Sequence, residues 1–197
     1  MTLNEMAYAL AEMQEKSDDY AFVERMKFTV INHRALLIRR DVDRNATISN
    51  QYQQSFLVEG FTFHDLSDSE RSSAAIPIPL RLKNSTGITR VQGEDSGTLY
   101  YPCTLESLAY MEYSKFSSNS LNYFISDGFL HLYPCEDDRV RVTGIFQDPR
   151  EVPGYQGDNS EFPIPADMAQ QVLQSILSGE FQIQDPNNNQ VDIESQK

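Results

Sequence analysis

The strongest constraint on the fold is a pair of aromatic-rich runs between residues 121 and 133, LNYFIS and FLHLY. They are joined by Asp127-Gly128, a dipeptide that suits a tight turn in which both residues need positive φ. Turns of this kind connect neighbouring antiparallel strands, so the segment predicts a β-hairpin. The chain therefore contains antiparallel sheet, and other segments must extend that sheet or pack elsewhere.

Two segments outside the hairpin favour further strands. The sequence RVRVTGIF (139–146) alternates Val140 and Val142 with polar residues, a pattern typical of a half-buried strand. The sequence GITRVQG (87–93) is compatible with another short strand, and residues 104–116 are compatible with a helical turn or an ordered loop. We expect the strand at 139–146 to follow the hairpin as its third member.

The segment IPIPLRL (76–82) places Ile76, Ile78 and Leu80 at alternate positions. Its prolines cannot donate to a central ladder, so the segment predicts an edge strand or an extended arm. We expect these three residues, together with Phe124 and Phe129 of the hairpin, to contact neighbouring chains.

Helical periodicity marks both ends of the chain. Apolar residues recur at spacings of three and four over residues 2–15, which predicts an amphipathic helix. A second helix is predicted over about 19–40, capped by Ser17 or Asp18. A last helix is predicted over about 166–178, with Pro165 in its first turn and Gly179 after its end.

The stretches between these elements are less well defined. We expect residues 45–61 to form a loop and then a short helical stretch ending near Gly60, and residues 61–75 to form a polar loop. The predicted fold class is α+β, with N-terminal and C-terminal helices forming one body and a central antiparallel β region with extended arms. The expected parts, all within one structural unit, are a helical part (1–60), a β-rich region (61–150), a connector with the last helix (151–180) and a flexible acidic tail (181–197).

Composition excludes several functions. The chain has 29 acidic and 16 basic residues and a formal net charge of −13, so bulk attraction to nucleic acid or an anionic membrane is not expected. The first sixteen residues show no basic leader and no long apolar run, so we expect neither a signal peptide nor a membrane anchor. Cys103 and Cys135 are expected to be free thiols in a cytosol-like compartment.

Catalytic and cofactor motifs are not found. No glycine-rich phosphate loop occurs, and no histidine has a second His or Cys at metal-ligand spacing. His33 is expected to be a satisfied core histidine and His131 to pack within the hairpin. His64 with Asp65 is left as a candidate acid–base pair, although such a dipeptide is common. We therefore expect no enzyme activity, no metal and no cofactor.

The stretch NHRALLIRRDVDRN (32–45) is the richest in arginine. On a helical wheel Arg34, Arg39 and Arg40 point roughly 120° apart, whereas a DNA-reading helix gathers its bases on one side. The cations could simply complement the helix C-terminus, or they could pair with carboxylates of a neighbouring chain. The residues alone leave both readings open; in a chain that assembles with copies of itself, we expect these three arginines to form inter-chain ion pairs.

The same helix has apolar residues on two faces, because Ile31 and Ile38 lie nearly opposite a stripe that includes Val30 and His33. Such a helix is sandwiched, either within its own core or between that core and a neighbour. The expected interface with a neighbouring chain comprises Arg34, Arg39, Arg40, Ile31, Ile38, Met168, Val172 and Ile176.

The order of segments resembles a known family. HRALLIRRDVDRN after an opening helix, IPIPLRL, the hairpin running into VTGIFQDPREVP, and EFPIPADMAQQVLQSIL together resemble the head–tail connector (adaptor) ring proteins of short-tailed bacteriophages, particularly crAss-like phages. The resemblance covers about residues 1–180 and rests on segment order and short phrases, of which GIFQDP followed by the PIP-led helix is the strongest.

The resemblance implies a structural role in the virion. Such proteins form a ring, usually of twelve copies, beneath the portal protein, where they extend the DNA channel and present a platform for further tail or ring proteins. The family has no known catalytic residues to transfer. DNA is expected to pass without specific binding, and no membrane partner is expected. Two alternatives stay open: a monomeric binding module that uses the aromatic hairpin, and a hydrolase built around His64.

Overall fold

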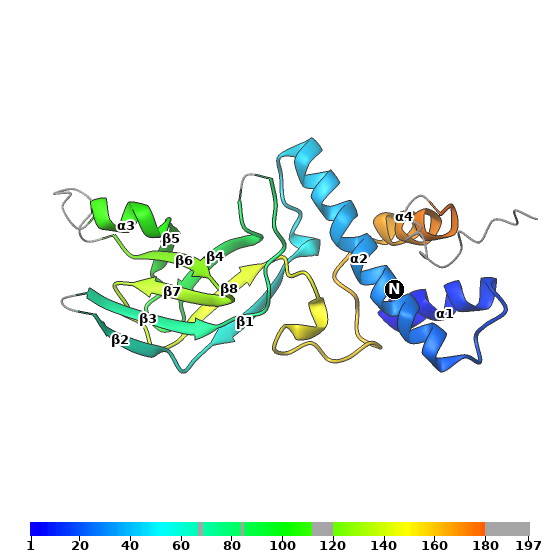
Figure 1. The fold of residues 1–197 in the computed structure, drawn as a ribbon, viewed down its shortest axis with the longest axis horizontal. Coiled ribbons are helices and arrows are strands. Elements are labelled where there is room, and N and C mark those ends of the chain that lie inside the picture. Colours follow the sequence, from blue (N-terminus) through cyan, green and yellow to red (C-terminus); the bar gives the residue numbers. More distant parts are fainter. Residues whose placement is uncertain (67–68, 84, 112–119, 180–197) are drawn as a thin grey trace, which may run out of the picture.

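The chain is elongated, with most of its helices gathered at one end and a curled sheet, which carries one short helix, at the other (Figure 1). The computed structural model describes residues 1–66, 69–83, 85–111 and 120–179. Both helices and sheet are present in separate parts of the molecule, which confirms the α+β class. The predicted tail at 181–197 lies outside the described residues.

The opening helix α1 (Leu3–Met13) confirms the prediction for residues 2–15. Its start is set by a capping box: Glu5 N donates to Thr2 Oγ1 at 3.1 Å, and Thr2 N donates to Glu5 Oε2 at 2.8 Å. The face formed by Leu3, Met6 and Leu10 is buried. Burial of this stripe against a neighbouring helix stabilises a helix that is too short to persist alone.

The second helix, α2 (Tyr20–Asn45), is longer than predicted. It begins at Asp19, whose side chain accepts from Phe22 N, rather than at Ser17 or Asp18. It continues past residue 40, and on this last part Asp41 accepts a hydrogen bond from Tyr52 Oη at 2.6 Å. It ends where Ala46 adopts a left-handed conformation with φ of 53°.

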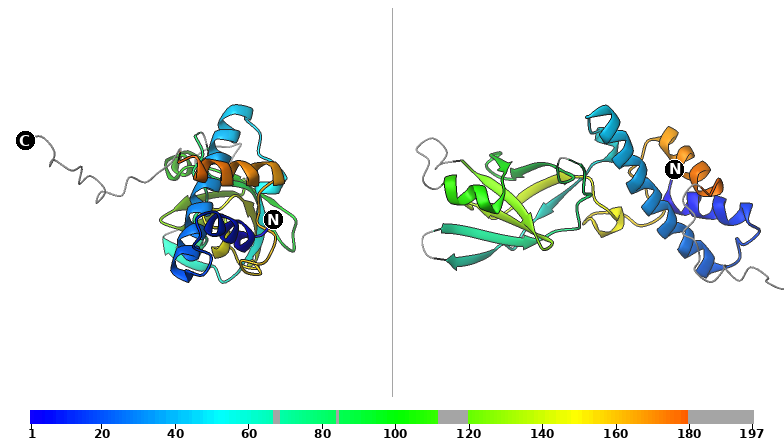
Figure 2. Two further views of the ribbon diagram at one scale, coloured as in Figure 1. Left: turned by 90° about the vertical axis from the view of Figure 1, so that its right-hand side faces the viewer. Right: turned by 45° about the horizontal axis from the view of Figure 1, so that its top comes forward.

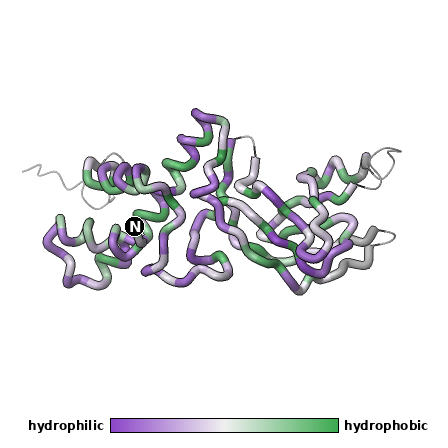
Figure 3. The backbone as a smooth tube through the Cα atoms, turned by 180° about the vertical axis from the view of Figure 1, so that it is seen from behind, coloured by the Kyte–Doolittle hydropathy of each residue, from purple (hydrophilic) through white to green (hydrophobic). Residues whose placement is uncertain are grey.

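The final helix, α4 (Ala166–Leu177), matches its prediction, and Gly179 after its end has φ of 67°. Helices α1 and α4 both pack on α2, and we call these three helices the helical unit. Their shared core contains Leu3, Leu10, Val30, Ile31, Phe162 and Val172. Hydrophobic and hydrophilic stretches alternate along the three helices, as Figure 3 shows.

Within the described residues eight strands form the sheet unit, in the order β1-β8-β4-β5-β6-β7-β3-β2. The strands are β1 (Gln54–Val58), β2 (Thr62–Leu66), β3 (Ser69–Ala75), β4 (Ile88–Gly93), β5 (Leu99–Pro102), β6 (Asn122–Ser126), β7 (Phe129–Tyr133) and β8 (Val140–Gly144). All the pairings are antiparallel except that of β5 with β6. The parallel pair needs a long crossover, and α3 (Leu105–Met111) lies in it, as residues 104–116 had partly suggested.

The predicted hairpin is confirmed. β6 and β7 pair across Asp127 and Gly128, which have φ of 53° and 81°. The strand predicted at 139–146 is also present as β8, but it pairs with β1 and β4 and not with the hairpin. We predicted this strand beside the hairpin because it follows the hairpin in the sequence. Its position is different because the chain crosses the sheet between β7 and β8.

Two other predictions were wrong. Residues 45–61 form no helix beyond a short 3-10 turn (Asn50–Tyr52) before β1, where burial of Phe56 and Val58 follows the two-residue period of a strand. The polar stretch 61–75 is not a loop: it forms β2 and β3, and small Ser72 and Ser73 are buried where β3 pairs with β7. The first strand of the sheet therefore begins at Gln54.

The segment 76–82 is extended but belongs to no named strand; it docks on its own chain instead. Leu80 N donates to Ile145 O at 2.8 Å, and Gln147 N donates to Ile78 O at 2.9 Å. The approach is close enough that a Cβ at Gly87 would lie 2.5 Å from Ile145 O. The expected arm is thus held in place within the chain.

The two units share a third core, which we call the junction core. It is formed by Ala35 and Ile38 of α2, Met168 of α4, and Tyr52, Leu80, Leu82 and Ile145. Because one apolar cluster contains side chains from both units, their separation costs buried apolar surface. No helix within the described residues is long and apolar enough to cross a membrane.

Candidate assembly surfaces

Arg34 lies in the interior of the chain. Its side chain has no solvent exposure and donates three hydrogen bonds to backbone carbonyls: Nε to Pro163 at 3.0 Å, and the two terminal nitrogens to Phe146 at 3.1 Å and Tyr52 at 3.2 Å. Its guanidinium also lies 5.6 Å from the centre of the Phe162 ring. The position differs from the expected inter-chain ion pair, because every contact here is within the chain.

The three carbonyls belong to the two connections between the units: one lies on the way out to the sheet unit, and the other two lie near the ends of the return to α4. Tyr52 precedes β1, Phe146 follows β8, and Pro163 precedes α4. A guanidinium presents donors in several fixed directions, so one side chain can hold three segments at once. Burial lowers the pKa of Arg34 to about 10, and the nearby Asp148 opposes that shift. Arg34 therefore holds three chain segments together at the junction of the two units, and we call this arrangement the clamp.

The two-sided apolar character of α2 is explained by its own chain. Ile31 is 3% exposed and packs with α1 and α4, whereas Ile38 is fully buried in the junction core. Met168 and Val172 are buried in these same cores, and Ile176 is half-buried. Of the two readings left open, burial within the chain is the one observed for these positions.

Arg39 and Arg40 lie nearer the surface. Arg39 is half-buried, and its Nε has no hydrogen-bond partner in the part of the chain that the structure describes. Arg40 is exposed and lines a hollow of about 550 Å³ between α2 and α4, as does Arg44 one turn later. Asp41 lines the same hollow, but its carboxylate accepts from Tyr52 Oη and Asn45 Nδ2. The outward arginines are thus Arg40 and Arg44, with Arg39 between surface and core.

The expected contact residues of the arm and hairpin divide by exposure. Ile78 is 56% exposed and Phe129 is 43% exposed, so both can meet a neighbour. Ile76, Leu80 and Phe124 are buried in the chain. Phe124 stacks on His131 with ring centres 4.5 Å apart, which explains why the hairpin aromatics do not form one open surface. The contact area expected for a binding module is correspondingly small.

The histidines give no catalytic arrangement in the part of the chain that is described. His33 is buried, and its Nδ1 lies 3.0 Å from Ser175 Oγ; burial lowers its pKa. It is the satisfied core histidine that was expected. His64 lies in β2, and its side chain is outside the described residues. No three His, Cys, Asp or Glu side chains among those described are close enough together to hold a metal ion.

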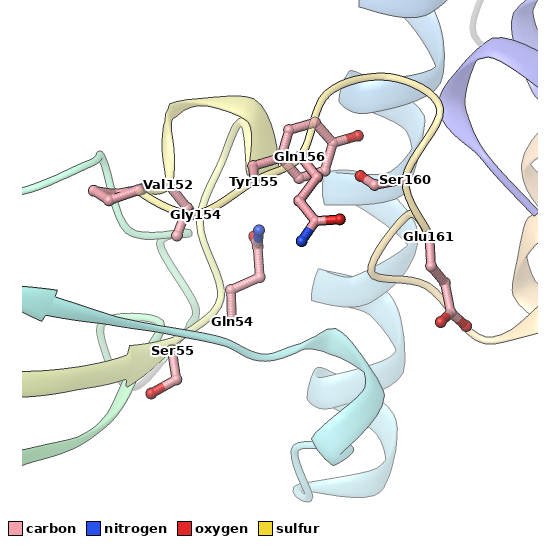
Figure 4. A pocket seen from close by; sticks show the side chains of 9 residues that line it. Gln54, Ser55, Val152, Gly154, Tyr155, Gln156, Ser160 and Glu161 are labelled. Atoms are coloured by element: carbon pink, nitrogen blue, oxygen red, sulfur yellow. The ribbon is translucent and has the colours of Figure 1, made fainter.

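A second hollow, of about 380 Å³, lies between the start of β1 and the segment 152–161 (Figure 4). We call this segment the connector and the hollow the connector hollow. Gln54 points into it from β1, opposite Gly154 and Gln156 of the connector. Gln54 Nε2 donates to Pro149 O at 3.1 Å, but Oε1 is buried and accepts no hydrogen bond. Glu161 lies at its other end and is exposed.

The connector is held firmly to the helical unit. Lys27 of α2 pairs with Asp158 at 2.9 Å, and Asn4 N donates to Asp158 O at 3.1 Å. Phe162 N donates to Met1 O at 3.3 Å, which ties the connector to the start of the chain. Sequence reasoning missed this hollow because a Pro- and Gly-rich stretch carries no periodicity that would reveal where it docks.

Two surface arginines of β8 and its start are paired with carboxylates of their own chain. Arg139 donates to both carboxylate oxygens of Asp95 at 3.0 Å, and Arg141 donates to both of Glu94 at 2.6 and 2.9 Å. These bidentate pairs leave little free positive charge for a phosphate. The strand β8 therefore does not offer a nucleic-acid site.

The described surface therefore has hollows, outward arginines and exposed apolar side chains, but no assembled catalytic group. A family comparison places the chain among the phage tail ring proteins, which are structural components of the virion. Within that class the match is to phage tail ring protein 2, the second ring family of the crAss group, over residues 5–196, and the chain belongs to this family. No individually curated protein matches the chain. The resemblance drawn from the sequence is confirmed.

Proposed function

We propose that this ring protein is a head-to-tail connector subunit. In this account about twelve copies close into a ring that docks under the portal protein, extends the DNA channel and supports further tail or ring proteins. Membership of the phage tail ring family supports the ring itself. Assembly takes place in the host cytoplasm, and the mature protein is part of the virion.

The observation that carries the proposal is the clamp at the junction. Arg34 and the junction core hold the helical unit and the sheet unit as one elongated body (Figures 1 and 2). A ring subunit must transmit force between a portal on one side and a tail on the other. A body whose two ends are fixed to each other suits that task better than two units on a flexible linker.

Charge supports a conduit that does not bind DNA. The chain carries a net charge of −13, and Arg139 and Arg141 are paired within it. Twelve such subunits around DNA would repel its phosphates, so DNA could pass without being held. We propose no catalytic role, metal or cofactor for this protein.

The proposal is tested by mixing the purified chain with the matching portal protein and counting bound copies by native mass spectrometry. We expect twelve copies per portal ring. Charge reversal at Arg39 or Arg40 should give virions without tails, or a chain that no longer binds the portal. Tailed particles of normal number from both variants would contradict the role proposed for these two residues, and a chain that never binds the portal would contradict the connector role.

A further inference from the structure

The two flanks of the elongated body differ in charge. Helix α2 crosses the molecule obliquely, so its C-terminal end lies on one flank and the connector lies on the opposite flank (Figure 1). The view along the long axis in Figure 2 shows the same separation. Each flank therefore faces a different side of any neighbour that stands alongside.

The first flank is basic, although the chain as a whole is acidic. Arg40 and Arg44 are exposed on the last turns of α2, and Arg81 and Lys83 are exposed on the adjacent short loop. That loop is next to α2 because Leu82 packs in the junction core against Val42. Asp43 and Asp167 are also exposed there, and Asp41 is occupied by Tyr52 and Asn45. Basic residues still outnumber acidic ones on this flank. We call Arg40, Arg44, Arg81 and Lys83 the basic flank.

The opposite flank has free carboxylates and a hollow. Glu151 and Glu161 are exposed, and no described side chain forms an ion pair with either. The other two nearby carboxylates, Asp148 and Asp158, are paired with Arg150 and Lys27. Between the free carboxylates and β1 lies the connector hollow, where Gln54 Oε1 still lacks a donor.

Donors and acceptors therefore face outward on opposite flanks of one chain. We infer that the connector hollow is the docking site for the basic flank of a second copy of this chain. Arg44 is the donor nearest the end of α2, and it would approach Glu161, whose carboxylate is exposed at the rim of the hollow. The contact is head-to-tail, so repetition generates a ring when the rotation closes. The inference rests on the proposed ring and names the surfaces that build it.

Charge-assisted contacts of this kind set register and orientation more than total affinity. In most other orientations Glu161 would face an acidic surface, because the chain carries a net charge of −13. The acidic character of the rest of the molecule thus favours the one arrangement in which the basic flank meets the connector. This would give specificity to a ring made from identical, mutually repelling subunits.

The contact is tested by cross-linking in assembled particles. Arg44→Cys and Glu161→Cys are placed together in a chain whose Cys103 and Cys135 are changed to serine, and particles are treated with a short bismaleimide. We expect a ladder of covalent multimers that ends at the ring number. The Arg44→Cys and Glu161→Cys single variants are the matched controls and should stay monomeric on a denaturing gel.

Charge exchange tests the same contact without a cross-linker. Arg44→Glu alone and Glu161→Arg alone should each lower incorporation into particles about tenfold, and the double variant should return to within about threefold of the parent, because paired contacts are non-additive. Arg139→Glu, an exposed arginine paired in its own sheet unit, should incorporate normally.

The outcomes separate the two claims. Rings that form but give no ladder, with no rescue in the double variant, would overturn the inferred contact and leave the ring intact. Particles in which the unmodified chain forms no ring would overturn the proposed function itself. A ladder that stops at dimers would also overturn the inference, because a head-to-tail contact must continue around the ring.

Discussion

Arg34 Nε and the carbonyl oxygen of Pro163 lie 3.0 Å apart although 129 positions separate the two residues. This hydrogen bond joins the middle of α2 to the segment that returns from the sheet unit. The other two donors of the same guanidinium bind Tyr52 O, just before the first strand, and Phe146 O, just after the last strand. The charge is buried without a paired carboxylate among the described residues, so neutral carbonyl oxygens provide its solvation.

Replacement of Arg34 by methionine should destabilise the chain by about 3 kcal/mol, since three buried carbonyls lose their donor while the aliphatic volume is kept. Chemical denaturation followed by far-UV circular dichroism measures this loss. Arg90→Met, at an exposed arginine of β4, is the control and should change stability by less than about 0.5 kcal/mol. Equal effects of the two substitutions would show that Arg34 is not a clamp.

Gly87→Ala should weaken the docking of the segment 76–82. A Cβ at this position would meet Ile145 O at 2.5 Å and Leu80 O at 2.8 Å, both of them backbone atoms that cannot rotate away. Overpacking of this kind costs about 1–3 kcal/mol. Hydrogen exchange should show faster exchange of the Leu80 and Ile145 amides than in the parent. Unchanged exchange at both amides would contradict the close approach.

Substitutions of Ile76 and Ile78 in the segment 76–82 should distinguish an effect on folding from an effect on assembly. Ile76→Ser should destabilise the isolated chain by about 2 kcal/mol because Ile76 is 7% exposed within the sheet core. Ile78→Ser should leave thermal stability within a degree or two of the parent, since that side chain is 56% exposed. We expect Ile78→Ser to lower incorporation into particles if Ile78 contacts a neighbour. Normal incorporation would remove Ile78 from the interface.

Acid should destabilise the chain through His33. Burial lowers the pKa of this imidazole below its ordinary 6.5, so the unfolded chain binds a proton that the folded chain excludes. Stability is therefore fully present above pH 6.5 and declines as the pH falls toward the folded pKa. Two-dimensional NMR titration gives that pKa directly, and His33→Gln should flatten the pH dependence of unfolding below pH 6.5. A folded pKa at or above 6.5 would contradict the assignment.

Local signals predicted the fold well where neighbouring residues determine structure. The Asp127-Gly128 turn, the α1 stripe and the end of α4 all depend on residues within a few positions of each other. Strand order was not predictable, because β8 pairs with β1 and β4, whose partners are distant in the sequence. The polar strand β3 was missed because small serines can be buried in a sheet without an apolar pattern.

At the candidate site, too, the sequence predicted local features but not those that depend on distant segments. The wheel separated the directions of Arg34, Arg39 and Arg40, but it could not say which direction leads to solvent. Arg34 turned out to be buried because three backbone carbonyls satisfy it, and such acceptors carry no sequence signal. The connector hollow was unforeseen for a similar reason, since its shape depends on where a Pro- and Gly-rich segment docks.

The central claim is that copies of this chain form one ring between the portal and the tail. Cryo-electron microscopy of the intact particle tests it most directly. We predict a twelve-fold ring directly beneath the portal, into whose density this two-unit body fits with the connector of each copy against the α2 end of the next. A particle in which this chain lies elsewhere, or in which no closed ring of it is present, would contradict the account.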